Sequence, residues 1–89
     1  MRPPLSTFER AHGHQLGVLL AQARQQQGRS AAAVAKSTEV SVDSIRSVES
    51  GRTPTPGFLL IARIAEALEL SLDDLHREAH ALARDGSNQ

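Results

Sequence analysis

Apolar residues recur three or four positions apart in five separate stretches of this chain, which is the spacing of amphipathic helices. None of these stretches shows the apolar–polar alternation that is typical of a half-buried strand. The pattern therefore predicts an all-α domain of five helices. The residues that define the five apolar faces are Leu16, Leu19, Leu20 and Ala23; Val34 and Ala35; Ile45 and Val48; Leu59, Leu60, Ile61, Ile64, Ala65 and Leu68; and Leu72, Leu75, Ala79 and Leu82.

A residue that favours a helix start precedes each of the five stretches. These expected caps are Ser6 or Thr7, Ser30, Ser41, Thr55 and Ser71. Pro56 suits the first position of the fourth helix, and Gly28 is expected to end the first helix near residue 27. Gly13 either interrupts that helix or is absorbed in it. The domain is expected to span residues 6–84, between a disordered arm at 1–5 and a loose tail at 85–89.

The segment 30–51 predicts two short helices joined by a tight turn. The first, over 31–36, is followed by only four residues, 37–40, before Ser41 opens the second. Ile45 and Val48 lie on one face of that second helix, and Gly51 can end it because glycine enters the left-handed region freely. Two short helices joined in this way are the helix-turn-helix pattern, whose second helix enters the DNA major groove.

Residues within this unit and on both sides of it form a pattern that covers most of the chain. They are, in order, Leu16, Leu19, Leu20, Arg24, Gly28, Ser30, Val34, Ala35, Val40-Ser41, Ile45, Val48-Glu49-Ser50-Gly51-Arg52, Pro54, Leu60, Ile64, Ala65, Ala67, Leu68, Leu70, Ser71, Leu72 and Leu75. In order and spacing, residues 16–75 resemble the Cro/phage-repressor (Xre) family of helix-turn-helix DNA-binding domains. The resemblance implies that fold, double-stranded DNA as partner, and a structural ion pair between Arg24 and Glu49. Without the pair, these two residues would be solvated charges worth less than about 1 kcal/mol.

Two positions depart from the family pattern. The family usually has a glycine in the turn, where this chain has Glu39, so either Glu39 adopts positive φ at a cost of about 1 kcal/mol or the turn has another shape. The family often opens its second helix with a glutamine, where this chain has Ala31, which has no side-chain hydrogen bond to offer.

Four residues on the far side of the third helix from Ile45 and Val48 are candidates for contacts with base edges: Val42, Asp43, Arg46 and Ser47. A valine suits a thymine methyl group, an aspartate the cytosine amino group, and an arginine a guanine or a phosphate. Asp43 also has a purely structural explanation, because an acid in the first turn of a helix is stabilising by itself.

Candidate phosphate contacts combine helix starts with basic side chains. They are Ser30, Lys36, Ser41, Arg52 and Thr53. Ser30 and Ser41 are also the expected caps of their helices, and a capping serine still leaves other amides free to meet a phosphate.

Composition and charge narrow the classes of function that the chain could have. The net charge is zero, but residues 1–65 carry +4 and residues 66–89 carry −4, so the helix-turn-helix half is basic. The chain has no cysteine and no apolar run long enough for a membrane span, which favours the cytoplasm.

His76 and His80 have metal-ligand spacing but lack a third ligand, so we expect solvated histidines and no metal. No catalytic motif or cofactor motif is present, and we expect no enzyme.

The sequence therefore predicts a sequence-specific transcriptional regulator, with a repressor favoured, that acts as a homodimer through its fourth and fifth helices. The alternative is a protein-interaction module, such as an antitoxin or an adaptor, on the same scaffold. Ala31, Glu39, Asp43 and the zero net charge favour the alternative, whereas the basic first half favours DNA binding.

Overall fold

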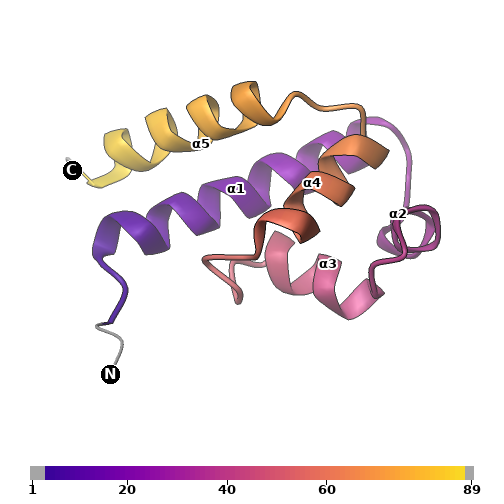
Figure 1. The fold of residues 1–89 in the computed structure, drawn as a ribbon. Coiled ribbons are helices and arrows are strands. Elements are labelled where there is room, and N and C mark those ends of the chain that lie inside the picture. Colours follow the sequence, from indigo (N-terminus) through magenta and orange to yellow (C-terminus); the bar gives the residue numbers. More distant parts are fainter. Residues whose placement is uncertain (1–3, 88–89) are drawn as a thin grey trace.

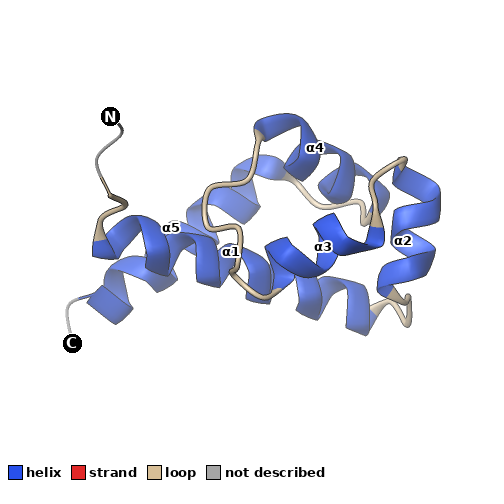
Figure 2. Ribbon diagram, turned by 90° about the horizontal axis from the view of Figure 1, so that it is seen from below, coloured by secondary structure: helices blue, strands red, loops and turns tan. Residues whose placement is uncertain are grey.

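The structure is a computed structural model, which describes residues 4–87. It contains five helices: α1 (Thr7–Gln26), α2 (Ala31–Thr38), α3 (Val42–Glu49), α4 (Phe58–Ala67) and α5 (Leu72–Ser87) (Figure 1). Residues 4–87 form no strand, as Figure 2 also shows. The predicted all-α architecture is confirmed. The first three residues of the expected arm and the last two of the expected tail lie outside the described part of the chain.

The long helix α1 lies between α5 and the helix-turn-helix unit formed by α2 and α3. It packs against α5 on one side and against α3 on the other (Figure 1). Helix α2 contacts both α3 and α4. The short helices α2 and α3 are thus held on a platform formed by α1 and α4.

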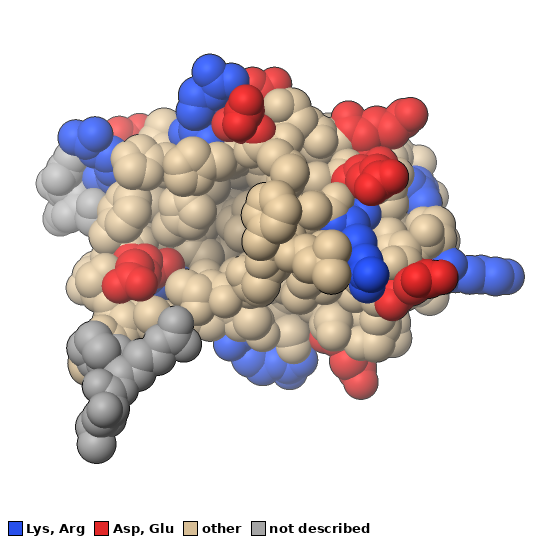
Figure 3. Space-filling model, in the orientation of Figure 1, with Lys and Arg blue, Asp and Glu red and all other residues tan. Residues whose placement is uncertain are grey.

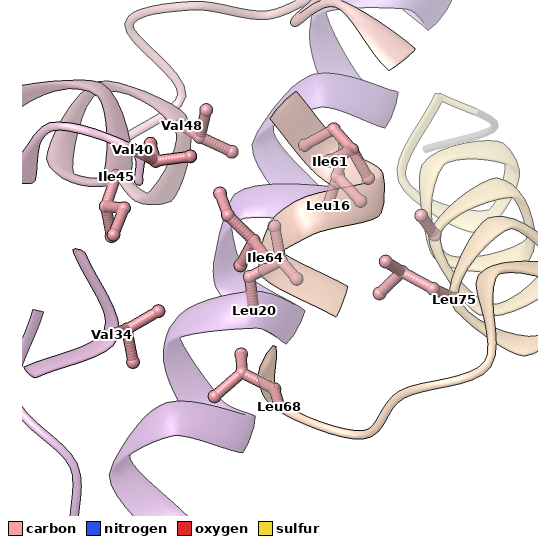
Figure 4. Packing of buried hydrophobic residues seen from close by; sticks show 11 residues of the cluster. Leu16, Leu20, Val34, Val40, Ile45, Val48, Ile61, Ile64, Leu68 and Leu75 are labelled. Atoms are coloured by element: carbon pink, nitrogen blue, oxygen red, sulfur yellow. The ribbon is translucent and has the colours of Figure 1, made fainter. Parts of the chain in front are cut away.

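The core between these helices is entirely aliphatic. Leu20, Ile45 and Ile64 are almost completely buried, and Figure 4 shows Leu20 and Ile64 side by side between α1 and α4. Full burial of such a side chain contributes about 1.5–3 kcal/mol. The apolar faces predicted for the first four helices supply most of this cluster. Their burial fixes which side of α3 is turned away from the core.

The start of α1 follows its sequence signals. Ser6 is the N-cap: its hydroxyl accepts from the Glu9 amide at 3.0 Å, and the Glu9 carboxylate accepts from the Ser6 amide at 3.0 Å. Gly13 is absorbed in the helix. A Cβ atom at Gly13 would lie 2.2 Å from the Pro54 carbonyl oxygen, so the loop after α3 rests directly on this glycine.

The expected start of α4 at Thr55 and Pro56 is wrong. Helix α4 begins at Phe58 with Gly57 as its N-cap, and no side chain caps it. Residues 52–55 form bends instead of a helical turn, and Pro54 is held against α1. Tertiary packing of this loop thus overrides a local start signal.

Helix α5 differs from its prediction at its C-terminal end. It continues to Ser87, so residues 85–87 are helical and not part of a loose tail. Its buried line runs through Leu75, Ala79 and Ala83, whereas Leu82 is 38 % exposed. The buried line therefore continues from Ala79 to Ala83, one turn further along the helix, and not to the predicted Leu82.

The turn between α2 and α3 contains a left-handed residue although that residue is a glutamate. Glu39 lies in the left-handed region with φ of 60°, and Val40 beyond it is buried. The buried Thr38 hydroxyl donates to the Val34 carbonyl at 2.9 Å and accepts from the Val40 amide at 3.2 Å. The surrounding contacts therefore hold Glu39 in a conformation that its side chain disfavours.

Replacing Glu39 with glycine should stabilise the fold. A glycine adopts positive φ without the Cβ clash, and we expect a gain of about 1 kcal/mol in the free energy of unfolding, measured by urea denaturation. The control is Ala32→Gly at an exposed position within α2, which should cost about 1 kcal/mol. A destabilised Glu39→Gly variant would contradict this account of the turn.

Candidate nucleic-acid interface

Helix α3 is held in the core by two buried side chains, and a serine directly before it caps its N-terminus. Ile45 and Val48 are each 1 % exposed and hold one side of the helix in the core. The Ser41 hydroxyl accepts from the Ser44 amide at 3.1 Å and donates to the Ser44 hydroxyl at 2.9 Å. Ser44 was not singled out in the sequence, although its place three residues after the cap is the usual signal for such a bond. The start of α3 is therefore fixed in position and open to solvent.

All four candidate base-contacting residues lie off the core side of α3. Asp43 and Arg46 are exposed, whereas Val42 and Ser47 are half-buried. The side of α3 that faces solvent thus carries an acid, a base, a hydroxyl and a small apolar group, which together offer the kinds of contact that base edges accept.

Ser47 and Arg52 are joined across the end of α3. The Arg52 guanidinium donates to the Ser47 hydroxyl from Nε at 3.1 Å and from Nη2 at 2.6 Å. The Thr53 amide donates to the Ser47 carbonyl at 3.1 Å. A residue expected at the bases and a residue expected at a phosphate are therefore in direct contact, and the exposed Arg52 side chain is held beside the helix.

The other candidate phosphate contacts lie at the ends of α2 and α3. Ser30 is the exposed N-cap of α2, and its hydroxyl accepts from the Ala33 amide at 3.0 Å. Ser41 is the exposed N-cap of α3. Lys36 is exposed in the last turn of α2, and Thr53 is half-buried in the loop. Helix N-termini with free amides and a nearby cation suit an anionic backbone.

A bidentate ion pair ties α3 to α1. Arg24 donates to the Glu49 carboxylate from Nε at 2.7 Å and from Nη2 at 2.9 Å, with side chains only 15 % and 14 % exposed. The hydrogen bond to Glu49 raises the pKa of Arg24 against the opposing effect of burial. Nη1 of Arg24 also donates to the Arg29 carbonyl at 2.9 Å. The ion pair that the family resemblance implies is present in the structure.

Arg29 and Gln27 complete a network that the sequence did not reveal. Arg29 donates to the Ala67 carbonyl at 2.7 Å and to the Ser37 hydroxyl at 3.1 Å, and Gln27 donates to the Leu68 carbonyl at 2.8 Å. These side chains satisfy carbonyls at the end of α4, which have no partner within their own helix. No local pattern marks this role, because the contacts join segments far apart in the chain.

Charges of both signs are mixed on the face seen in Figure 1. Figure 3 shows acidic and basic side chains around a hollowed centre that carries no charge. The charge difference between the two halves of the sequence therefore does not give this face a uniform sign.

Three histidines from α1 and α5 come together with Phe8. The ring centroid of His12 in α1 lies 5.6 Å from His76 and 6.4 Å from His80 in α5, and His76 and His80 are 5.8 Å apart. The Phe8 centroid lies 5.1 Å from His80. Within residues 4–87, no group of three or more histidine, cysteine or acidic side chains is arranged to hold a metal ion. The expectation of solvated histidines holds for His76, which is exposed, whereas His80 and its neighbour His12 are half-buried in this cluster.

The cluster should make the stability of the fold depend on pH. Burial, and then the charges of His76 and His80, lower the pKa of His12. Since the unfolded chain binds this proton more readily, the contribution of His12 is complete above about pH 6.5 and is lost as pH falls through its folded pKa. We expect the urea midpoint to fall between about pH 7.5 and 5.5. His12→Gln should reduce this fall, whereas His14→Gln, on the same helix outside the cluster, should not.

The family match agrees with this geometry. The chain matches the helix-turn-helix domain over residues 15–79 and belongs to that family of DNA-binding domains, which are typically non-enzymatic. The matched range is consistent with the Cro/phage-repressor resemblance. A search of curated proteins gave no match. No helix within the described residues is long and apolar enough to cross a membrane.

Proposed function

We propose that this protein is a sequence-specific DNA-binding transcriptional regulator, with repression as its mode, which inserts α3 into the major groove. The observation that carries the proposal is the exposed polar side of α3, presented by a helix that Ile45, Val48 and the Arg24–Glu49 pair fix to the core. A helix held in this way can meet DNA without reorganising, which is the geometry of helix-turn-helix readers.

The contacts divide into two groups in this proposal. Val42, Asp43, Arg46 and Ser47 read base edges, and the caps Ser30 and Ser41 meet phosphates together with Lys36, Arg52 and Thr53. The Ser47–Arg52 hydrogen bonds support the proposal that Arg52 is oriented before DNA arrives, because they hold its side chain beside α3. Pre-organisation of this kind lowers the entropic cost of binding.

A homodimer would place two copies of α3 on a two-fold DNA site. Several leucines of α4 and α5, the helices expected to form this interface, belong to the monomer core instead: Leu75 is buried, and Leu60 and Leu72 pack against the core. Phe58 and Leu59 remain 76 % and 60 % exposed at the start of α4. We propose that the start of α4 forms the interface between the two copies.

The same exposed pair supports the second candidate function. Large exposed apolar side chains near one another on a small domain are typical of a protein-binding surface. In that case the scaffold would act as an antitoxin or adaptor, and the solvent side of α3 would have no reading role. The two candidates differ in how binding responds to salt.

A salt titration separates them. Fluorescence anisotropy with a mixed-sequence duplex, and with sites selected from a random-sequence pool, should show affinity falling linearly on a log–log plot against salt concentration. The slope reports phosphate contacts that release counterions. The absence of binding to any selected duplex at low salt would favour the protein-interaction function.

Substitutions on α3 and in the loop should have different effects. Arg52→Ala should weaken binding to all sequences and lower the salt slope by about one unit, because it removes a phosphate contact. Val42→Ala should change the preferred sequence by about 1–3 kcal/mol at a contacted base pair, with little change in non-specific affinity. Asp43→Asn should tighten non-specific binding, because it removes a negative charge near phosphates. If none of the three changes DNA affinity, α3 is not the reading helix.

A further inference from the structure

A cavity of about 350 Å³ opens between the first half of α1, the loop before α4 and α5. Its walls include the rings of Phe8, His12, His76 and His80, together with Pro54 and Pro56. Cavities of this size that are mostly apolar, with a few convergent polar groups, are the usual form of small-molecule sites. Neither the family match nor the proposed DNA surface makes use of this cavity.

The shape of the wall favours a flat ring as ligand. Four side-chain rings lie with neighbouring centroids 5.1–6.4 Å apart and with interplanar angles between 44° and 70°. Aromatic groups pair favourably at these separations in tilted and edge-to-face arrangements. Pro54 and Pro56 supply further apolar surface to the lining. A ligand with one aromatic ring would therefore find favourable partners in this wall.

The charges around the cavity favour an acidic ligand, on one condition. Among the described residues, the cavity lining contains no lysine or arginine, so within that part of the chain the groups that can become positive are the three imidazoles. Glu9 also lines the cavity, with its carboxylate bonded to the Ser6 amide, and it opposes an anion while the histidines are neutral. The loop at 54–56 adds no titratable group. On the outer side of α5, Arg77, Arg84 and Asp85 lie around His76 and His80.

We propose that this cavity binds a small aromatic carboxylate together with a proton, which the histidine cluster takes up from water. The carboxylate offsets the repulsion between protonated imidazoles, and each protonated imidazole donates to it. The lowered pKa of His12 supports this mechanism, because it leaves the free cluster ready to accept a proton when an anion arrives. Binding does not depend on the proposed DNA function. Only an effect of the ligand on Arg52, two residues before Pro54, would rest on that function.

The test uses benzoate as the probe and benzamide as its neutral analogue of the same shape. Proton NMR of the full chain follows the imidazole C2–H signals of His12, His76 and His80, with the exposed His14 as the internal control. Benzoate should shift the three cluster signals and not that of His14. Affinity should be about tenfold tighter at pH 6 than at pH 8 for each pKa unit by which the bound anion raises the cluster. His12→Gln and, separately, His80→Gln should each weaken binding, with circular dichroism to verify their folding.

Three outcomes would overturn the proposal. Benzamide binding as tightly as benzoate would show that charge has no role in the site. Benzoate affinity that is equal at both pH values would exclude proton uptake. Shifts of His14 that match those of the cluster, or no cluster shift at millimolar benzoate, would show that the cavity is not a binding site for this class of ligand.

Discussion

Replacing Gly17 with alanine should destabilise the protein by about 3 kcal/mol or more, because a Cβ atom has no room between α1 and α3. It would lie 2.2 Å from the Val48 carbonyl oxygen and 2.7 Å from the Glu49 carbonyl oxygen. Both neighbours are backbone atoms in the last turn of α3, so no side chain can rotate away. The two helices would have to separate, at a cost above the roughly 1 kcal/mol that alanine gains over glycine within a helix.

Urea denaturation followed by far-UV circular dichroism measures this loss, and the thermal midpoint should fall by roughly 10–25 °C. Gly57→Ala is the matched control. No atom lies within 4 Å of a Cβ at Gly57 and its φ of −63° suits any residue, so this variant should lose only about 1 kcal/mol or less, the cost of alanine at an N-cap. A Gly17→Ala protein as stable as the control would show that α3 is not seated on this glycine.

The close contacts at Gly17 and Gly13 could not be predicted from the sequence. The two glycines lie four residues apart on one face of α1, and each admits a backbone segment: the end of α3 at Gly17 and Pro54 at Gly13. Small residues at this spacing permit close backbone approach. The sequence showed the spacing but not what would approach it. The helix stops at Gly28 and Gly51 were easier to predict, because their positive φ values of 68° and 78° satisfy a local need.

The rest of the fold divides in the same way. Ser41, Ile45 and Val48 defined α3 from the sequence, because a cap and an apolar face are both local signals. The start of α4 was missed because Pro54 packs on α1 and carries Thr55 and Pro56 out of helical geometry. The histidine cluster was missed for a related reason: His12 meets His76 only once α1 and α5 are paired. The candidate DNA residues could be proposed from the sequence because they lie on α3, near the ends of short helices, or in the loop that follows α3, all of which have local signals.

The second large effect is expected for Glu49→Ala, which removes the carboxylate from the Arg24 guanidinium. With side chains only 15 % and 14 % exposed, neither partner is well solvated when the other is removed. The variant leaves two donors of Arg24 without the oxygens that they contact at 2.7 and 2.9 Å. We expect a loss of about 1–3 kcal/mol in the free energy of unfolding. The value lies below that of a fully buried pair, because some water still reaches the site.

The chain supplies its own comparison in the pair between Arg77 and Asp74. That contact is also short, at 2.8 Å, but its side chains are 72 % and 75 % exposed. Arg77→Ala removes it without disturbing the acid in the first turn of α5, and should change stability by less than about 0.5 kcal/mol. Raising the salt concentration should leave the Glu49→Ala loss largely intact, since a mostly buried pair is weakly screened. If Glu49→Ala and Arg77→Ala have the same thermal midpoint, the ion pair does not fix the proposed reading helix to α1. Apolar contacts such as those of Ile45 and Val48 would then be enough to hold α3.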